Sequence, residues 1–409
     1  MHFLIINHQS SIINHQSSII NHQSSIINHQ SSIKICTSEL HNVQAIDAAT
    51  RSFLDSLHLD HQFCGSDYST YGRHSLDLIY VRTGGTEGLF QRLMPELEHR
   101  SNRPFRLLTS GTSNSLAASM EILSFLRQHG MQGEILHGSA DYISARIQLL
   151  AQAEEARRQL RSLRLGIIGH PSDWLIASDV KTEVVRQSLG IELIELPLPM
   201  FKNEVDGGTE GAMKIYEALK EIVVQHSLHG FTLRCFDLLT AIHNTGCLAL
   251  AKLNAEGIIA GCEGDVPAML SMAVTKAVTG VSGFQANPAH INPETGELLF
   301  AHCTIPLNMV ERYELDTHYE SGIGIGIRGF MHPGPVTIFK LAPDLSRHFI
   351  AEGELVRNQA QPNLCRTQQV IQLADSSQAR YFLTDPIGNH HIIMPGHHQV
   401  LLETLLADI

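Results

Sequence analysis

Three short, mostly apolar segments in the last third of the chain each contain a glutamate or histidine, which are residues that commonly bind metal ions. Glu263 follows one apolar run, and His302 lies within another. His390 and His391 stand next to each other near the C-terminus. A carboxylate and imidazoles on separate segments are the groups from which proteins build divalent-metal sites. The three segments together therefore predict a metal site.

Each of these residues also has a purely structural interpretation. Glu263 precedes a helix-like segment at 266–278, where a carboxylate would suit the first helical turn. His302 lies on the apolar face of a predicted strand, and a lone histidine in that position usually belongs to the core. His390 and His391 are adjacent, so in a strand their side chains point to opposite faces and only one of them can bind the metal.

Two further features bear on a ligand pocket. Segment 324–329 matches the G-x-G-x-x-G pattern, but a dinucleotide motif must open a helix, and Pro333 blocks one here. Arg328 in this segment is a candidate contact for an anion or a sugar, with an ordinary surface charge as the alternative. Trp174, the only tryptophan, lies in a turn after the predicted strand 165–169 and is a candidate substrate contact.

The elements that must position these residues follow an α/β pattern. Strand-like apolar runs alternate with helix-like segments up to about residue 295, and short β-rich runs follow. We predict two Rossmann-like α/β domains, at 33–163 and 164–295, and a β-rich C-terminal domain at 296–409. Ligands of open α/β sheets bind at the carboxyl ends of the strands. Glu263 directly follows one such end.

The N-terminal residues 1–32 are a separate feature. Residues 5–32 are four copies of Ile-Ile-Asn-His-Gln-Ser-Ser. Adjacent isoleucines and missing charges make this a poor coiled-coil heptad. The DNA heptamer ATCATCA, repeated and read in triplets, encodes the same peptide, which indicates a tandem DNA repeat. We predict that 1–32 is a disordered low-complexity extension or a misplaced start, with a metal-binding histidine tract as the alternative.

Charge and composition restrict the class of protein. The net charge of −12 argues against nucleic acid, whose phosphates favour basic partners. No apolar run reaches the ~18 residues that a membrane helix needs, and the N-terminus lacks the basic region of a secretory signal. The 7 cysteines are scattered without a C-x-x-C pair, which is typical of reduced thiols. We therefore expect a cytoplasmic protein without nucleic-acid or membrane partners.

The order of three motifs resembles one enzyme superfamily. The motifs at 261–265, 301–303 and 388–391 read Gly-Cys-Glu-Gly-Asp, Ala-His-Cys and Gly-Asn-His-His. They are similar to motifs of the L-fucose isomerase and L-arabinose isomerase superfamily, and the similarity runs from about Lys34 to the chain end. The resemblance implies ketol isomerase activity on a sugar, a Mn²⁺ site, two α/β domains and a β-rich C-terminal domain. It also implies a homo-oligomer whose active sites lie between subunits.

The resemblance further implies a set of metal ligands. The first metal-binding glutamate of the family falls on Glu263, and a ligand histidine falls on His302. The C-terminal ligand histidine falls on His390, with His391 as the alternative ligand or as a substrate contact. The second acidic ligand falls on Asn287, which would complete the site as a metal ligand and as a catalytic residue beside Glu263. An amide oxygen can bind a metal, but it cannot accept a proton as a carboxylate does.

Three functions stay open on these residues. The first is a Mn²⁺-dependent aldose–ketose isomerase acting on a small sugar through an enediol, with Glu263 as base and ligand. The second is a catalytically silent sugar-binding relative. Asn287 favours it, because Glu263 is then the only obvious base unless Asp265 or Glu320 replaces the lost acid. The third is a metal-dependent hydrolase.

Overall fold

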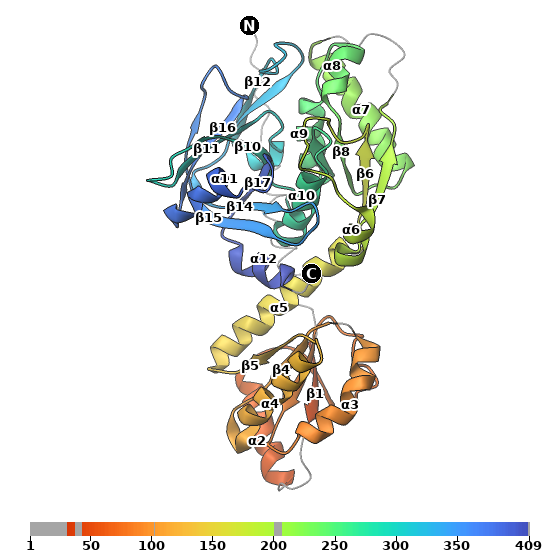
Figure 1. Ribbon diagram of the computed structural model, residues 1–409, viewed down its shortest axis with the longest axis vertical. Coiled ribbons are helices and arrows are strands. Elements are labelled where there is room, and N and C mark those ends of the chain that lie inside the picture. Colours follow the sequence, from red (N-terminus) through yellow and green to blue (C-terminus); the bar gives the residue numbers. More distant parts are fainter. Residues whose placement is uncertain (1–30, 37–42, 102, 200–206, 408–409) are drawn as a thin grey trace. The chain divides into compact units, whose positions relative to one another are not determined.

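The chain folds into two compact units, each with its own parallel β-sheet. The computed structural model (Figure 1) describes these residues: 31–36, 43–101, 103–199 and 207–407. One unit comprises the described residues up to Glu155 together with the chain end from Thr404, and the other comprises Ala156–Glu403. None of the helices in the described ranges is long and apolar enough to cross a membrane.

The first unit is a five-stranded parallel sheet with helices on both faces. Its strands, in the spatial order β2-β1-β3-β4-β5, are β1 (Ser31–Cys36), β2 (His61–Gly65), β3 (Asp77–Val81), β4 (Phe105–Leu108) and β5 (Gly133–Leu136). Its helices are α2 (Val43–Ser56), α3 (Glu87–Arg100), α4 (Ser115–Gln128) and α5 (Ala140–Leu160), the last of which continues into the second unit. Ile79 of β3 packs with Phe90 of α3, whereas its neighbour Leu78 packs with Leu54 of α2. Alternate strand residues therefore serve opposite faces of the sheet.

The end of the N-terminal repeat belongs to this sheet. Ser31 and Ser32 form the start of β1, and both are buried. The Ser32 hydroxyl donates a hydrogen bond to the Asp77 carboxylate on β3. The prediction of disorder for 1–32 is therefore wrong for its last two residues, because the repeat supplies small side chains to a buried strand. Residues 1–30 lie outside the described part of the chain.

The second unit begins with a four-stranded parallel sheet. Its strands, in the spatial order β7-β6-β8-β9, are β6 (Arg164–Ile168), β7 (Glu192–Leu196), β8 (Gly230–Leu233) and β9 (Ile259–Cys262). The accompanying helices are α6 (Thr182–Leu189), α7 (Thr209–Gln225), α8 (Phe236–Ile242), α9 (Cys247–Ala255) and α10 (Val266–Thr279).

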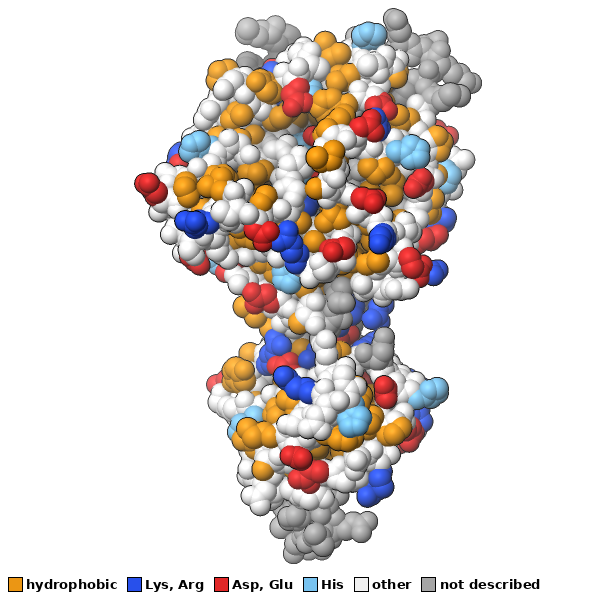
Figure 2. Space-filling view, viewed as in Figure 1, with side chains coloured by type: hydrophobic (Ala, Val, Ile, Leu, Met, Phe, Trp, Pro, Cys, Tyr) orange, Lys and Arg blue, Asp and Glu red, His pale blue; other side chains and the backbone are white. Residues whose placement is uncertain are grey.

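On the face drawn in Figure 2, acidic and basic side chains are interspersed, so the acidic side chains do not form a single patch on that face.

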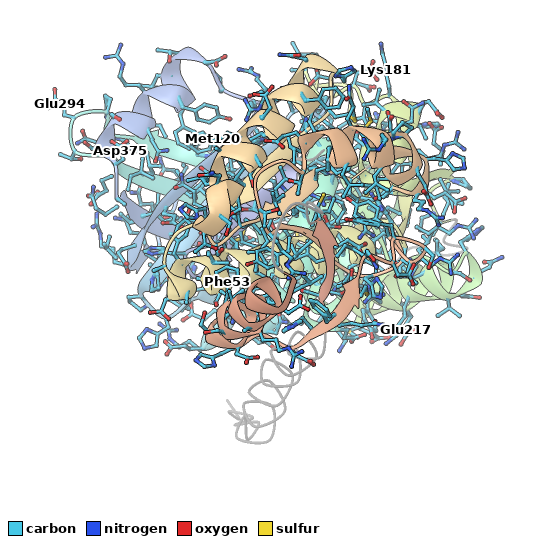
Figure 3. All side chains as sticks on the ribbon, turned by 90° about the horizontal axis from the view of Figure 1, so that it is seen from below. Phe53, Met120, Lys181, Glu217, Glu294 and Asp375 are labelled. Carbon is cyan, nitrogen blue, oxygen red and sulfur yellow. The ribbon has the colours of Figure 1, made fainter. Side chains whose placement is uncertain are left out.

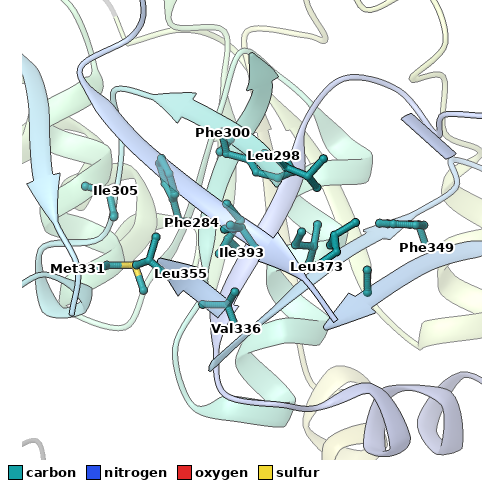
Figure 4. Close-up of a cluster of buried hydrophobic side chains, with 14 of the residues drawn as sticks. Phe284, Leu298, Phe300, Ile305, Met331, Val336, Phe349, Leu355, Leu373 and Ile393 are labelled. Carbon is teal, nitrogen blue, oxygen red and sulfur yellow. The ribbon is translucent and has the colours of Figure 1, made fainter. Parts of the chain in front are cut away.

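A closed antiparallel barrel follows in the same unit. Its strands, in the order β10-β11-β16-β15-β14-β17, are β10 (Phe284–Ile291), β11 (Glu297–His302), β14 (Gly334–Leu341), β15 (His348–Gln359), β16 (Thr367–Leu373) and β17 (His391–Pro395). Phe284, Phe300 and Ile393 belong to the cluster of buried side chains that fills it (Figure 4). A separate two-stranded sheet pairs β12 (Arg312–Asp316) with β13 (Gly326–Phe330). Two short helices, α11 (Tyr381–Thr384) and α12 (Gln399–Leu406), complete the chain.

The α/β units and the β-rich C-terminal region expected from the sequence are confirmed. The barrel starts at Phe284, before the predicted boundary at residue 296, and it shares one compact unit with the second parallel sheet. Helix α10 joins these two parts of the unit, because it packs against β9 of the sheet and against β14 and β17 of the barrel. The turn between β9 and α10 carries Glu263, so this packing brings the predicted ligand next to barrel strands.

Candidate metal centre

Glu263, His302 and His390 converge. Each offers one ligand atom, and these atoms all lie within 4.8 Å of one another. The Nε2 atoms of both histidines lie 3.5 Å from the same carboxylate oxygen, Oε1 of Glu263. That separation is long for a hydrogen bond. It matches the ~3.4 Å between ligand atoms that surround one ion tetrahedrally with bonds of ~2.1 Å. The two histidine–glutamate separations suit ligands of one ion, and the three side chains are a candidate site for a divalent metal.

The backbone directs Glu263 into this position through an unusual turn. Glu263 has a φ of 63°, in the left-handed region that only glycine adopts readily, and Gly264 follows with a φ of 66°. A side chain at Gly264 would place its Cβ 2.6 Å from the carbonyl oxygen of His170, so glycine is required there. A non-glycine residue held in this region stores strain, and such strain is typical of functional sites.

Trp174 holds the second oxygen of the same carboxylate. Its indole N–H donates to Oε2 of Glu263 at 3.1 Å. The Trp174 ring meets Phe236 edge-on at 5.0 Å between centroids, and Phe236 meets His318 at 5.7 Å. Trp174 is about half exposed, at 48%. An accessible aromatic side chain thus borders the ligand cluster, at the carboxyl end of β6, where a substrate could contact it.

His302 and His390 come from opposite ends of barrel strands. His302 is the last residue of β11, and the Thr304 hydroxyl lies 3.0 Å from its Nδ1. His390 immediately precedes β17, and its Nδ1 lies 2.8 Å from Oδ2 of Asp265. Both imidazoles are buried, and their ring centroids lie 5.3 Å apart. Among the described residues, Nε2 of His390 has no hydrogen-bond partner, which leaves this buried atom available to a metal.

The electrostatics of the metal-free cluster are those of an ion pair. Burial alone would lower the pKa of His390, but the Glu263 carboxylate and Asp265 raise that pKa to about 9. Burial alone would raise the pKa of Glu263, but His390 and His302 outweigh it and hold that pKa well below its usual range. The pKa of His302 is lowered, first by burial. A metal would therefore displace a proton from His390.

Asn287 lies on β10, between the other contributing elements. It pairs with Ala301, the neighbour of His302 on β11. Two residues earlier on the same strand face, the Gln285 amide accepts from the backbone N–H of Cys262 and donates to its carbonyl. Cys262 directly precedes Glu263. Coordination by Asn287 stays a prediction, and its strand position lies next to two segments that carry ligands.

His391, the alternative ligand, has hydrogen-bond partners other than Glu263, and its role as a substrate contact stays a prediction. The Nε2 of His391 lies 3.0 Å from the Tyr381 hydroxyl, and its Nδ1 lies 3.0 Å from the carbonyl oxygen of Asn389. Its ring is buried beside Phe349 and other aromatic side chains, so the structure brings His390 rather than His391 to Glu263. Burial is the first cause that lowers the pKa of His391, to about 3.

Arg328 lies on β13, where its guanidinium donates to Oδ2 of Asp316 at 2.8 Å. It also approaches Glu314 at 3.6 Å. Both carboxylates belong to the paired strand β12, so the observed partners of Arg328 are ion-pair partners within the two-stranded sheet. Its role as a sugar or anion contact stays a prediction.

The sequence interpretation missed Lys340. This lysine lies on β14 and is 1% exposed, with its Nζ 3.7 Å from Oδ2 of Asp265. The available signal was a lysine inside the otherwise apolar strand 336–341, because a charge there needs a buried partner. The sequence did offer Asp265 as a substitute base. The structure instead places it behind His390, fully buried.

Sequence comparison identifies proteins to which this chain is similar. No family model matches the chain. It is 21% identical to the sulfoquinovose isomerase of Alkalicoccus urumqiensis over 276 residues, which cover 59% of this chain and 62% of that protein. This chain is similar to sulfoquinovose isomerases. The enzyme of Priestia aryabhattai matches at 21% identity over 275 residues, again 59% of this chain and 62% of that protein. That of Clostridium sp. (strain MSTE9) matches at 22% over 226 residues, 48% of this chain and 49% of that protein. The matched region therefore spans less than two thirds of these relatives.

Proposed function

We propose that this protein is a divalent-metal-dependent aldose–ketose isomerase related to the L-fucose and L-arabinose isomerases. One observation carries the proposal. The Nε2 atoms of the buried His302 and His390 both lie 3.5 Å from the same carboxylate oxygen, Oε1 of Glu263. Similarity to proteins named sulfoquinovose isomerases supports the same reaction class. Sulfoquinovose is accordingly the first sugar to test. Mn²⁺ as the metal and a homo-oligomer with sites between subunits stay predictions from the resemblance.

In this proposal, Glu263, His302 and His390 hold the metal, and Asn287 adds an amide oxygen. A divalent ion supplies Lewis acidity, which polarises the carbonyl and hydroxyl oxygens of an aldose. Glu263 takes the proton from C2 of the sugar and returns it to C1. Trp174 donates to Oε2 of Glu263 at 3.1 Å and so fixes the direction in which the carboxylate meets the sugar.

Isomerisation also needs a group that exchanges a proton between the two sugar oxygens. Asn287 cannot do this, and Asp265 is fully buried with both oxygens already engaged. Glu320 is the proposed substitute. It lies between β12 and β13, two residues after His318, whose ring contacts Phe236. Burial, and after it the charge of Glu263, raises the pKa of Glu320, which favours its protonated form.

The second candidate function is a sugar-binding protein without catalysis, and Asn287 is the observation that favours it. One experiment distinguishes the isomerase from the sugar-binding protein. Purified protein with Mn²⁺ is incubated with sulfoquinovose, L-fucose or L-arabinose, and ketose formation is followed by proton NMR. Turnover by the wild type, lost in Glu320→Gln, supports the isomerase. If only Asn287→Asp converts a sugar, the binding protein is the correct assignment.

The metal site has its own test. Mn²⁺ affinity is measured by calorimetry for Glu263→Gln, which loses the anionic ligand charge, and for His302→Ala, which loses an imidazole ligand. Each variant should bind at least about tenfold more weakly. Glu297→Gln is the matched control, since Glu297 lies on β11 with His302 but pairs with Arg357 at the surface. If both variants bind Mn²⁺ as tightly as the wild type, the proposed metal site is wrong, and the proposed reaction is wrong with it.

A further inference from the structure

We propose that Asp265 is a positioning residue, which keeps the proton of His390 on Nδ1 and leaves Nε2 to face Glu263. This inference deepens the proposed function, because His390 is one of the proposed metal ligands. In this role Asp265 orients a metal ligand and does not itself take part in the reaction.

Both oxygens of Asp265 are committed. Oδ2 lies 2.8 Å from Nδ1 of His390, and both side chains are 0% exposed. Oδ1 accepts the backbone N–H of Ala268 at 2.7 Å, which caps the N-terminus of α10. A cap of this kind satisfies a backbone donor that the helix itself cannot pair. One carboxylate therefore serves a helix and an imidazole at once.

Glu263 and Asp265 act on the same ring from two sides. They lie in one turn, two residues apart, and the left-handed conformations of Glu263 and Gly264 separate their side chains. Oε1 of Glu263 lies 3.5 Å from Nε2 of His390, whereas Oδ2 of Asp265 lies 2.8 Å from Nδ1. An imidazole whose Nδ1 donates its proton must present a lone pair on Nε2 when neutral. The turn thus fixes both the orientation and the tautomer of the ligand.

Lys340 favours the ionised form of Asp265, which is the form that can accept a hydrogen bond from Nδ1–H of His390. Its Nζ lies 3.7 Å from Oδ2 of Asp265 in a fully buried setting, and no hydrogen-bond partner of Nζ is found in the described ranges. Its contribution is therefore the positive charge. This charge, together with the two hydrogen bonds that Asp265 accepts, favours the ionised carboxylate. An ionised Asp265 can only accept hydrogen bonds, so the proton stays on Nδ1 of His390.

An asparagine cannot replace this carboxylate, although it has nearly the same shape. The backbone N–H of Ala268 and Nδ1–H of His390 are both donors, and an amide has only one acceptor oxygen. If the amide oxygen keeps the cap, its NH₂ faces Nδ1 and the proton of His390 moves to Nε2, which blocks metal binding. If the amide turns round, the helix cap is lost instead. Asp265→Asn can therefore keep only one of the two hydrogen bonds that Asp265 accepts, and loss of the cap would appear as lower stability to urea.

The test compares Asp265→Asn with the wild type by calorimetry, using Mn²⁺ alone. The variant should bind Mn²⁺ about 10–100-fold more weakly, as is usual when such a supporting carboxylate is lost. The control is Asp375→Asn, because Asp375 caps η3 (Ser376–Arg380) by accepting from the Ser377 N–H at the surface, with no histidine involved (Figure 3). Its affinity should equal that of the wild type. Wild-type affinity together with wild-type stability to urea in folded Asp265→Asn would overturn the proposal, because neither the cap nor the contact with His390 would then have mattered.

A second readout needs no metal and no variant. Nitrogen-15 NMR of histidine-labelled, metal-free wild type at alkaline pH reports the tautomer of the neutral His390 ring, and the proton should be on Nδ1. A proton on Nε2 would overturn the role of Asp265 even if Asp265→Asn does not fold. Failure of the wild type to bind Mn²⁺, with the Nδ1–H tautomer present, would refute the proposed function and leave the positioning role intact.

Discussion

The metal-free protein should lose stability as pH rises from 6.5 to 9, because of His390. The pKa of His390 is raised from its ordinary 6.5 to about 9 in the folded protein, against the effect of burial, by Glu263 first and then by Asp265. The folded state therefore holds a proton that the unfolded chain has already released. This contribution to stability is complete below pH 6.5 and is lost as pH rises through about 9.

The magnitude follows from the shift. At about 1.4 kcal/mol per pKa unit, the free energy of unfolding should fall by about 3 kcal/mol over this window. His302 changes little there, because its lowered folded pKa places its own effect below pH 6.5. Urea unfolding in the presence of a chelator, at half-unit steps between pH 6 and pH 9.5, measures the fall.

A variant isolates the cause. Glu263→Gln removes the charge that contributes most to raising the pKa of His390, so the decline between pH 6.5 and 9 should become clearly shallower than in the wild type. Glu297→Gln should retain the wild-type decline, since Glu297 lies at the surface beside Arg357. The reasoning is refuted if the wild type shows no decline, or if Glu263→Gln declines as steeply as the wild type.

Three further outcomes are expected. Ser32→Ala should lower the free energy of urea unfolding by about 1–3 kcal/mol, because the buried Asp77 loses a donor; no change would mean that the end of the repeat contributes nothing. Lys340→Met should lower the free energy of urea unfolding by up to about 3 kcal/mol, because the buried Asp265 carboxylate loses one of its two cationic neighbours and keeps only His390; a neutral result would show that the Lys340 charge is dispensable. Mn²⁺ should quench the fluorescence of Trp174, the only tryptophan, in the wild type but only weakly in Glu263→Gln; equal quenching in both would place the metal elsewhere.

Much of the secondary structure could be predicted from the sequence, because its periodicities are local. The apolar run at 105–108 predicts a strand that coincides with β4, and the helix predicted from residue 116 to 129 corresponds to α4 at Ser115–Gln128. The start of the barrel could not be predicted in this way. Phe284 joins β17, which is more than one hundred residues later in the chain, and local patterns carry no information about such a partner.

The sequence by itself determined the chemical types of the ligands and their order along the chain. Glu263, His302 and His390 each stand out because a polar side chain in apolar sequence needs a partner. Spacing cannot show whether such residues meet. Only the tertiary structure brought them within 4.8 Å, because α10 packs between the sheet that carries Glu263 and the barrel that carries both histidines.

The tertiary structure also decided between neighbouring residues that the sequence left equivalent. His390 and His391 have the same chemistry, but strand alternation sends one to Glu263 and the other into the aromatic interior of the barrel. The sequence indicated Asp265 only as a possible substitute base, whereas in the structure one of its oxygens caps α10. Its second oxygen is committed by a histidine 125 residues away, and that contact exists only in the folded chain.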